Sequence, residues 1–185
     1  MGHQMNRVTQ IISILIVILC STILLAEESL VVSNYKLDSG DSIRISIFGE
    51  DEMLLETKLD DSGLITYPYI EQPIKVSGMS VKQLEVFLIQ QLKPDVYINP
   101  SIQISVTEYR PFFVNGQVNS PGGYPFQPGL NVSKAITLAG GLTERASESS
   151  IYVVRATDST ESKIKVQLND KVFPGDVLSI EESFF

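Results

Sequence analysis

Two stretches of the chain alternate strictly between apolar and polar residues. Ile43, Ile45 and Ile47 are separated by single polar residues, and residues 102–106 repeat the pattern. Successive side chains of a β-strand point to opposite faces, so each stretch predicts a strand with one buried face.

The region between these two strands contains turn-forming residues. Residues 60–63, Asp-Asp-Ser-Gly, predict a hairpin-type turn, and residues 64–67 predict the strand that follows it. Pro68 and Pro73 flank Tyr69 and Ile70, and they predict a loop or an edge strand, because proline cannot donate a ladder hydrogen bond.

The longest predicted helix begins after Ser80. Gln83 lies three residues further on, which is the spacing of a capping box, and Pro94 ends the helix. Asn99 and Pro100 then predict a turn before the strand at residues 102–106. The apolar face of the helix comprises Val81, Leu84, Phe87, Leu88 and Leu92.

Residues 113–155 predict a hairpin, a small helix and a further strand. The first strand leads into a turn cluster at residues 119–123, rich in proline and glycine. Asn131 is placed to cap a helix that Gly140 and Gly141 end. The strand follows at residues 151–155. The apolar stripe of this helix comprises Val132, Ala135, Ile136 and Ala139.

A Gly-Asp pair precedes an alternating strand at both ends of the chain. Residues 37–45 and 172–180 match in residue type around Gly40-Asp41 and Gly175-Asp176. We interpret the match as a recurring local turn and not as an internal repeat, because Gly-Asp is a common turn pair. Together these elements predict an α+β protein with a domain boundary near Arg110.

Composition restricts the class of protein. A chain of 185 residues with 43% hydrophobic residues is typical of one or two small globular domains. The formal net charge is −8, and no basic cluster is present in the sequence. This balance argues against binding to nucleic acid or to an anionic membrane surface.

The N-terminal 26 residues differ from the rest. Arg7 precedes an apolar run, and Ala26 is followed by two glutamates, which predicts a secretory signal peptide at residues 1–26. An uncleaved anchor is the alternative, although the run is shorter than the roughly 20 residues of a spanning helix. Acylation at Cys20 is a third option, which the preceding Leu19 disfavours because a small residue is usual there.

Candidate chemistry is sparse. The one histidine, His3, and the one cysteine, Cys20, both lie in the predicted signal peptide. The remaining chain offers no zinc ligands of these types and no Ser-His or Cys-His nucleophile. Paired carboxylates such as Asp60-Asp61 are typical of solvated turns. We therefore predict no catalytic residue, no metal site and no cofactor.

Aromatic residues are the remaining candidates for binding. A tyrosine can stack on a sugar ring and still offer a hydroxyl group, but burial in a core or an interface is the more usual role. The candidates are Tyr67, Tyr69, Tyr97, Tyr109 and Tyr124.

The motifs in this order resemble the outer-membrane polysaccharide export proteins (Wza-type). Residues 35–48, 61–80 and 99–106 resemble the export domain. Residues 114–118, 121–124, 139–142 and 154–155 resemble the soluble-ligand-binding β-grasp (SLBB) domain that follows it. The residues that carry these motifs are Gly40, Asp41, Asp61, Gly63, Pro68, Gly78, Asn99, Pro100, Gly116, Pro121, Gly122, Gly140 and Gly141.

The resemblance implies an α+β fold with an export domain at residues 27–110 and an SLBB domain at residues 111–185. It also implies a non-enzymatic periplasmic protein, associated with the outer membrane, that forms a homo-oligomeric ring. Capsule or exopolysaccharide would pass through the ring, which would work with an inner-membrane polysaccharide co-polymerase.

Three departures from the family pattern modify this expectation. The chain shows one SLBB domain and no terminal amphipathic helix, so a separate outer-membrane β-barrel partner is expected. Cys20 lacks the context for acylation, and Glu71-Gln72 stand where the family tends to have a glycine. A soluble periplasmic carbohydrate-binding module is the main alternative function, and a polysaccharide-modifying enzyme is a third.

Overall fold

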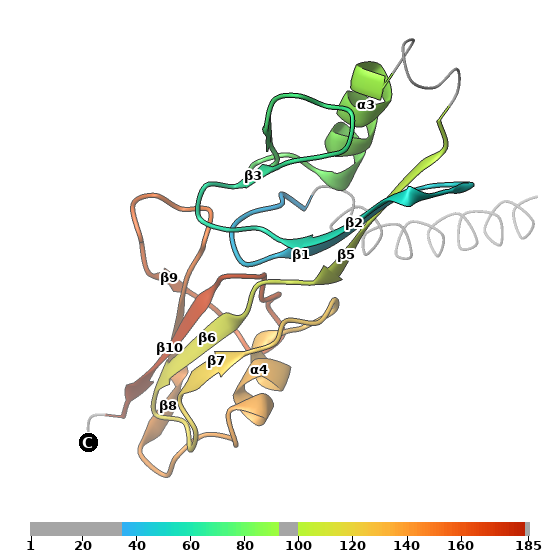
Figure 1. Cartoon of the computed structure of the whole chain (residues 1–185). Helices are drawn as coiled ribbons and strands as arrows, with labels where there is room; N and C mark the ends of the chain where they lie inside the picture. The colour runs from blue at the N-terminus through green and yellow to red at the C-terminus, as the bar shows by residue number, and fades with distance from the viewer. Residues whose placement is uncertain (1–34, 93–99, 184–185) are drawn as a thin grey trace, which may run out of the picture. The chain divides into compact units, whose positions relative to one another are not determined.

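The computed structural model describes residues 35–92 and 100–183, shown in colour in Figure 1. These residues form three sheets and two helices, which confirms the predicted α+β class. Neither of the two described helices is long and apolar enough to cross a membrane.

The first sheet has three antiparallel strands in the order β2-β1-β5. They are β1 (Ser42–Ile47), β2 (Glu50–Lys58) and β5 (Ile102–Glu108). Ile43, Ile45 and Ile47 are buried, which confirms the alternation in β1. In β5, Ile102 is buried and Ile104 and Val106 are partly buried, while the residues between them are exposed, which confirms the predicted alternation. The long strand β2 was not predicted, because Met53 is its one buried residue and its start is acidic.

Helix α3 (Val81–Leu92) begins as predicted. The Ser80 hydroxyl accepts a hydrogen bond from the Gln83 amide at 3.2 Å, and the Gln83 side chain accepts one from the Ser80 amide at 2.9 Å. These reciprocal bonds confirm the capping box. Leu84, Leu88 and Leu92 are buried, while Val81 and Phe87 are partly buried. Pro94 lies outside the described residues.

The region between β2 and α3 differs from the prediction in two ways. Strand β3 (Leu64–Ile65) ends before Thr66 and pairs with β4 (Ile74–Lys75), so the predicted strand at residues 64–67 is too long. Tyr67 instead inserts into the core and donates a hydrogen bond from its hydroxyl to the Met53 carbonyl at 2.8 Å. The strands on either side of residues 60–63 do not pair with each other, because β2 pairs with β1 and β3 pairs with β4. The turn at residues 60–63 is therefore not a hairpin turn.

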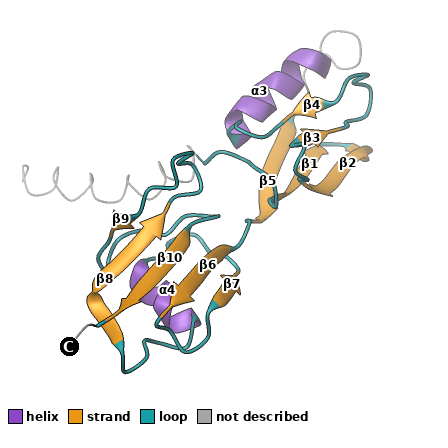
Figure 2. Cartoon of the chain, turned by 90° about the vertical axis from the view of Figure 1, so that its left-hand side faces the viewer, coloured by secondary structure: helices purple, strands orange, loops and turns teal. Residues whose placement is uncertain are grey.

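The second sheet has five strands in the order β7-β6-β10-β8-β9 (Figure 2). They are β6 (Phe112–Gly116), β7 (Gly122–Tyr124), β8 (Ala146–Val154), β9 (Ile164–Lys165) and β10 (Val177–Glu182). Strands β6 and β10 are parallel, and the other neighbours are antiparallel. The predicted hairpin β6–β7 and the strand after Gly175-Asp176 are confirmed. Strand β8 begins earlier than predicted and ends at Val154.

Helix α4 (Val132–Leu138) covers one face of this sheet. Asn131 caps it as predicted, since its side chain accepts a hydrogen bond from the Lys134 amide at 2.9 Å. The predicted apolar stripe is buried against the sheet residues. The resulting core comprises Phe112, Val114, Val118, Leu130, Val132, Ala135, Ile136, Ala139, Ile151, Val153, Val166, Val172, Leu178 and Ile180.

Candidate functional site

Buried polar side chains are the first place to look for chemistry. Within residues 35–92 and 100–183, the buried polar side chains are Asp41, Ser80 and Asp176, and no cluster of potential metal ligands is found. Ser80 caps helix α3. The two aspartates, both from the Gly-Asp pairs, therefore need a separate explanation.

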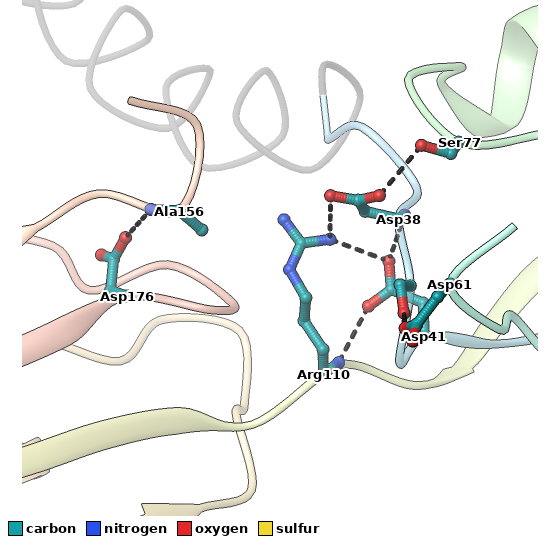
Figure 3. A network of polar contacts seen from close by, with 8 residues as sticks. Asp38, Asp41, Asp61, Ser77, Arg110, Ala156 and Asp176 are labelled. Atoms are coloured by element: carbon teal, nitrogen blue, oxygen red, sulfur yellow. Dashed lines mark hydrogen bonds and ion pairs between the residues drawn. The ribbon is translucent and has the colours of Figure 1, made fainter. Parts of the chain in front are cut away.

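Asp41 is 0% exposed and accepts hydrogen bonds through both carboxylate oxygens. Oδ2 accepts from the Asp38 amide at 2.9 Å, and Oδ1 accepts from the Arg110 amide at 2.8 Å. The Arg110 guanidinium lies 3.3 Å from Oδ2 and 3.9 Å from a carboxylate oxygen of Asp38 (Figure 3). Asp41 thus ties the turn before β1 to the segment that follows β5.

Asp176 repeats this arrangement in the second sheet. Its Oδ2 accepts from the Phe173 amide at 2.8 Å and from the Arg155 guanidinium at 2.5 Å. Its Oδ1 accepts from the Ala156 amide at 3.4 Å, as Figure 3 shows. Burial raises the pKa of Asp176 above its ordinary value, and the hydrogen bond from Phe173 and the charge of Arg155 offset only part of this effect.

The two Gly-Asp turns share their geometry. Each aspartate amide donates to the carbonyl of the residue three positions earlier at 3.1 Å, and the glycine before each aspartate has a positive φ. In both turns an arginine just beyond the neighbouring antiparallel strand supplies the counter-charge. Both carboxylates are engaged by several donors, which suits a structural role better than proton transfer.

Some motif residues of the export region are linked to the first turn, and others lie elsewhere. Asp61 accepts from the Ser39 hydroxyl at 2.8 Å, and the Gly78 amide donates to the Leu37 carbonyl at 2.8 Å. Gly63 has a φ of 60°, and a β-carbon there would lie 2.4 Å from the Ser77 β-carbon.

Gly40 and Asp41 form the turn itself. Pro68 lies in the turn before Tyr69, Pro100 precedes β5, and Asn99 lies outside the described residues.

The motif residues of the SLBB region lie at the end of helix α4 and at the end of β6. The Asn119 side chain donates to the Gly140 carbonyl at 2.7 Å, and its amide donates to the Gly141 carbonyl at 3.1 Å. Pro121 follows in the same turn, and Gly122 and Gly123 already belong to β7, so the predicted turn cluster at residues 119–123 is two residues too long. These contacts join the β6–β7 connection to the helix.

Gly116 marks a close approach between two strands. Its φ is 88°, and a β-carbon at this position would lie 2.1 Å from the Ile180 carbonyl oxygen of β10. Only glycine fits this position without displacing the backbone of the neighbouring strand.

The tyrosines predicted as stacking candidates are not brought together as one group. Tyr67 is buried, and Tyr124 is partly buried and donates a hydrogen bond to the Ser120 carbonyl. Tyr109 packs edge-on against Phe126, with ring centroids 5.4 Å apart. Tyr69 is exposed and has a positive φ of 62°. Tyr97 lies outside the described residues.

A different set of aromatic and polar residues lies on the second sheet, on the face opposite helix α4. Phe112 and Val114 of β6, Ile151 and Val153 of β8, and Leu178 and Ile180 of β10 belong to the core below α4. The residues that alternate with them point to the opposite face, because strand side chains alternate. We call this surface the open face.

A row of polar side chains crosses the open face. The strand register places Asn115 beside Ser179, Ser179 beside Tyr152, and Tyr152 beside Lys165. The adjacent row joins Gly123, Phe113, Val177 and Val154. Sequence reasoning missed Phe113 and Tyr152 as candidates. The alternation of side chains within β6 and β8 could have indicated which face of the sheet these two residues lie on. It could not have indicated which residues of other strands lie beside them.

Two family models match the chain. The model described as polysaccharide biosynthesis/export protein matches residues 30–107, and the model described as SLBB domain matches residues 111–167. The two matches follow each other without overlap, and in the order that the resemblance implies.

Curated relatives agree with these matches. The chain is 32% identical to the exopolysaccharide production protein ExoF of Rhizobium meliloti (strain 1021) over 83 residues, 44% of this chain and 20% of that protein. It is 30% identical to the polysialic acid transport protein KpsD of Escherichia coli over 125 residues, 66% of this chain and 22% of that protein. The chain thus spans about a fifth of the length of each of these relatives.

The fold and these matches define a protein built from an export domain and a β-grasp-like domain in series. The chain belongs to the polysaccharide export protein family (Wza-type), with one export domain followed by one SLBB domain. The family is one of polysaccharide export, and the printed names of the two relatives refer to exopolysaccharide production and to polysialic acid transport.

Proposed function

We propose that this protein is a periplasmic, outer-membrane-associated component of a channel that exports capsule or exopolysaccharide. The observation that carries the proposal is the export domain match at residues 30–107, followed directly by the SLBB match. The printed names of the relatives, exopolysaccharide production and polysialic acid transport, support a polysaccharide as the cargo.

A structural, non-enzymatic role is part of this proposal. Asp41 and Asp176, the buried carboxylates of the described residues, each accept several hydrogen bonds and pair with an arginine. A carboxylate that is held by several donors is a poor proton shuttle. The thirteen motif residues of the resemblance would then act by shaping turns and close contacts.

We further propose that the protein forms a homo-oligomeric ring. Strands β2, β7 and β9 lie at sheet edges, and an uncovered edge favours pairing with another chain. A head-to-tail contact that closes on itself produces a ring. Sedimentation analysis of the purified protein tests this part. A single oligomeric species is the expected result, and a monomer at all concentrations would argue against it.

The remaining assignments are proposals of the same kind. They are a signal peptide at residues 1–26 without acylation, an export domain at 27–110 and an SLBB domain at 111–185. The proposed partners are an inner-membrane polysaccharide co-polymerase and an outer-membrane β-barrel.

A soluble carbohydrate-binding module without a conduit role is the second candidate. The observation in its favour is the open face, whose exposed polar and aromatic side chains suit contact with a glycan. Deleting the gene and restoring it on a plasmid separates the two functions. For the export component, extracellular polymer is lost on deletion and returns on complementation. For the binding module, the protein binds oligosaccharides while deletion leaves the amount of secreted polymer unchanged.

A further inference from the structure

The open face of the five-stranded sheet has the chemistry of a glycan-binding surface. We propose that it binds a strand of acidic polysaccharide, with Phe113 and Tyr152 stacking on sugar rings and Asn115, Ser179 and Lys165 contacting their substituents. That the bound glycan is the exported polymer rests on the function proposed above.

The polar row has free hydrogen-bonding capacity. Asn115 and Lys165 are exposed, and Ser179 and Tyr152 are partly exposed. Among the described residues, none of these four side chains forms a hydrogen bond or an ion pair with another part of the chain. An amide, two hydroxyls and an ammonium group therefore remain available for a ligand.

This row is also long enough for a polymer. It crosses four neighbouring strands, β6, β10, β8 and β9, in direct register. Neighbouring strands lie about 4.8 Å apart, so the row extends over about 14 Å. A ligand with donors and acceptors repeated along its length fits such a row better than a compact molecule does.

The aromatic residues provide apolar surfaces beside the row. Phe113 is 43% exposed although it lies on a paired strand. Gly123 is its partner on β7, and a β-carbon at Gly123 would lie 2.9 Å from the Phe113 ring. The glycine thus leaves space for the ring to lie across the edge strand. An aromatic face of this kind suits the apolar face of a sugar ring.

The charges at the β9 end favour an acidic glycan. Lys163 lies 3.7 Å from Glu181, so these two charges offset each other. Lys165 has no carboxylate within ion-pair distance in the described part of the chain. Its positive charge complements a carboxylate on a sugar, in contrast to the acidic chain as a whole, whose net charge is −8.

Binding to the full, purified protein tests the proposal. The probes are an oligosialic acid and an oligogalacturonate, which carry carboxylates, and a malto-oligosaccharide, which is neutral. Calorimetry gives the affinities, and far-UV circular dichroism with thermal melting establishes that each variant is folded. We expect the acidic probes to bind more tightly than the neutral probe at low salt, and the difference to shrink as salt is added.

The variants separate the parts of the surface. Phe113→Ala and Tyr152→Ala each weaken binding of the acidic probes on the order of tenfold, since stacking is lost. Lys165→Gln weakens binding of the acidic probes by a factor of about three to ten and leaves binding of the neutral probe unchanged. Phe48→Ala and Lys134→Gln, which remove an exposed phenylalanine and lysine outside the open face, are the matched controls and leave all affinities unchanged.

Tyr152→Phe keeps the ring and removes only the hydroxyl, so it provides a variant with little risk of misfolding. A smaller loss of affinity than for Tyr152→Ala agrees with stacking. Failure of the wild type to bind any probe, or equal effects of the open-face and control variants, overturns the proposal. A shift in sedimentation without a change in glycan affinity assigns the open face to contact between copies of this chain, which also overturns it.

The two proposals fail in different ways. If deletion of the gene abolishes polymer secretion while no probe binds the open face, the export function stands and the glycan surface does not. If the probes bind as expected while deletion leaves secretion unchanged, the glycan surface stands and the export function does not.

Discussion

Replacing Asp41 by asparagine tests the explanation given for the first Gly-Asp turn. The substitution keeps the size of the side chain and removes its charge. Asp41 accepts hydrogen bonds from the amides of Asp38 and Arg110 at 2.9 and 2.8 Å, and the Arg110 guanidinium lies 3.3 Å away. Asparagine has one acceptor oxygen, so at least one of these donors loses its partner.

The expected cost follows from burial. Removing one partner of a buried ion pair costs about 3–5 kcal/mol, because the other charge stays buried. The side chain of Arg110 is 12% exposed, and in the variant it would still have the carboxylate of Asp38 at 3.9 Å. These two facts place the cost near the lower end of the range of about 3–5 kcal/mol. We therefore expect Asp41→Asn to lower the free energy of unfolding by about 3 kcal/mol. For a chain of this length the melting temperature falls by roughly 10 °C.

Urea denaturation followed by far-UV circular dichroism measures this change, since the chain contains no tryptophan to report by fluorescence. Glu56→Gln is the control. Glu56 pairs with Arg44, and both side chains are 53% exposed, so its loss costs less than about 1 kcal/mol. Equal effects of the two substitutions, or a loss below about 0.5 kcal/mol for Asp41→Asn, would refute the reasoning.

Three further substitutions test other parts of the structure. Gly116→Ala places a β-carbon 2.1 Å from the Ile180 carbonyl oxygen, so urea denaturation should show the free energy of unfolding lowered by about 3 kcal/mol or more. An unchanged free energy of unfolding would contradict the close approach of the two strands. Asn131→Ala removes the cap of α4 and should cost about 1 kcal/mol, whereas Asn131→Asp should retain most of the stability. Burial raises the pKa of Asp176, so the folded protein binds a proton at this carboxyl more tightly than the unfolded chain does. Thermal melts of wild type and Asp176→Asn at successive pH values measure the difference in stability between the two proteins. The stability of wild type relative to the variant should decrease as pH rises from 3.8 through the folded-state pKa. An increase over that range would contradict a raised pKa of Asp176.

Local signals in the sequence predicted much of the fold. The capping box at Ser80, the cap at Asn131 and the alternation at Ile43, Ile45 and Ile47 each depend on residues close in sequence, and each is confirmed. Strand β2 was missed because it lies at a sheet edge with Met53 as its one buried residue, so it has no alternation. Strand β3 was predicted too long because Tyr67 is apolar enough for a strand but serves as a core residue after it.

The open face could not be predicted from local patterns. Asn115, Tyr152, Lys165 and Ser179 each occur as an isolated residue in a different strand. Only the register of β6, β10, β8 and β9 brings them into one row. That register depends on the parallel pairing of β6 with β10, which joins segments more than 60 residues apart in sequence. The motif residues gave no indication of it, since they lie in turns and at strand ends.

The involvement of this protein in polysaccharide export is tested most directly by following labelled polymer after the protein is depleted. Cells receive a pulse of labelled sugar, and the label is then measured in polymer inside and outside the cells over time. We expect labelled polymer to accumulate inside depleted cells while the extracellular fraction falls, with total synthesis initially unchanged. An unchanged ratio of extracellular to intracellular labelled polymer after depletion would contradict the proposed function.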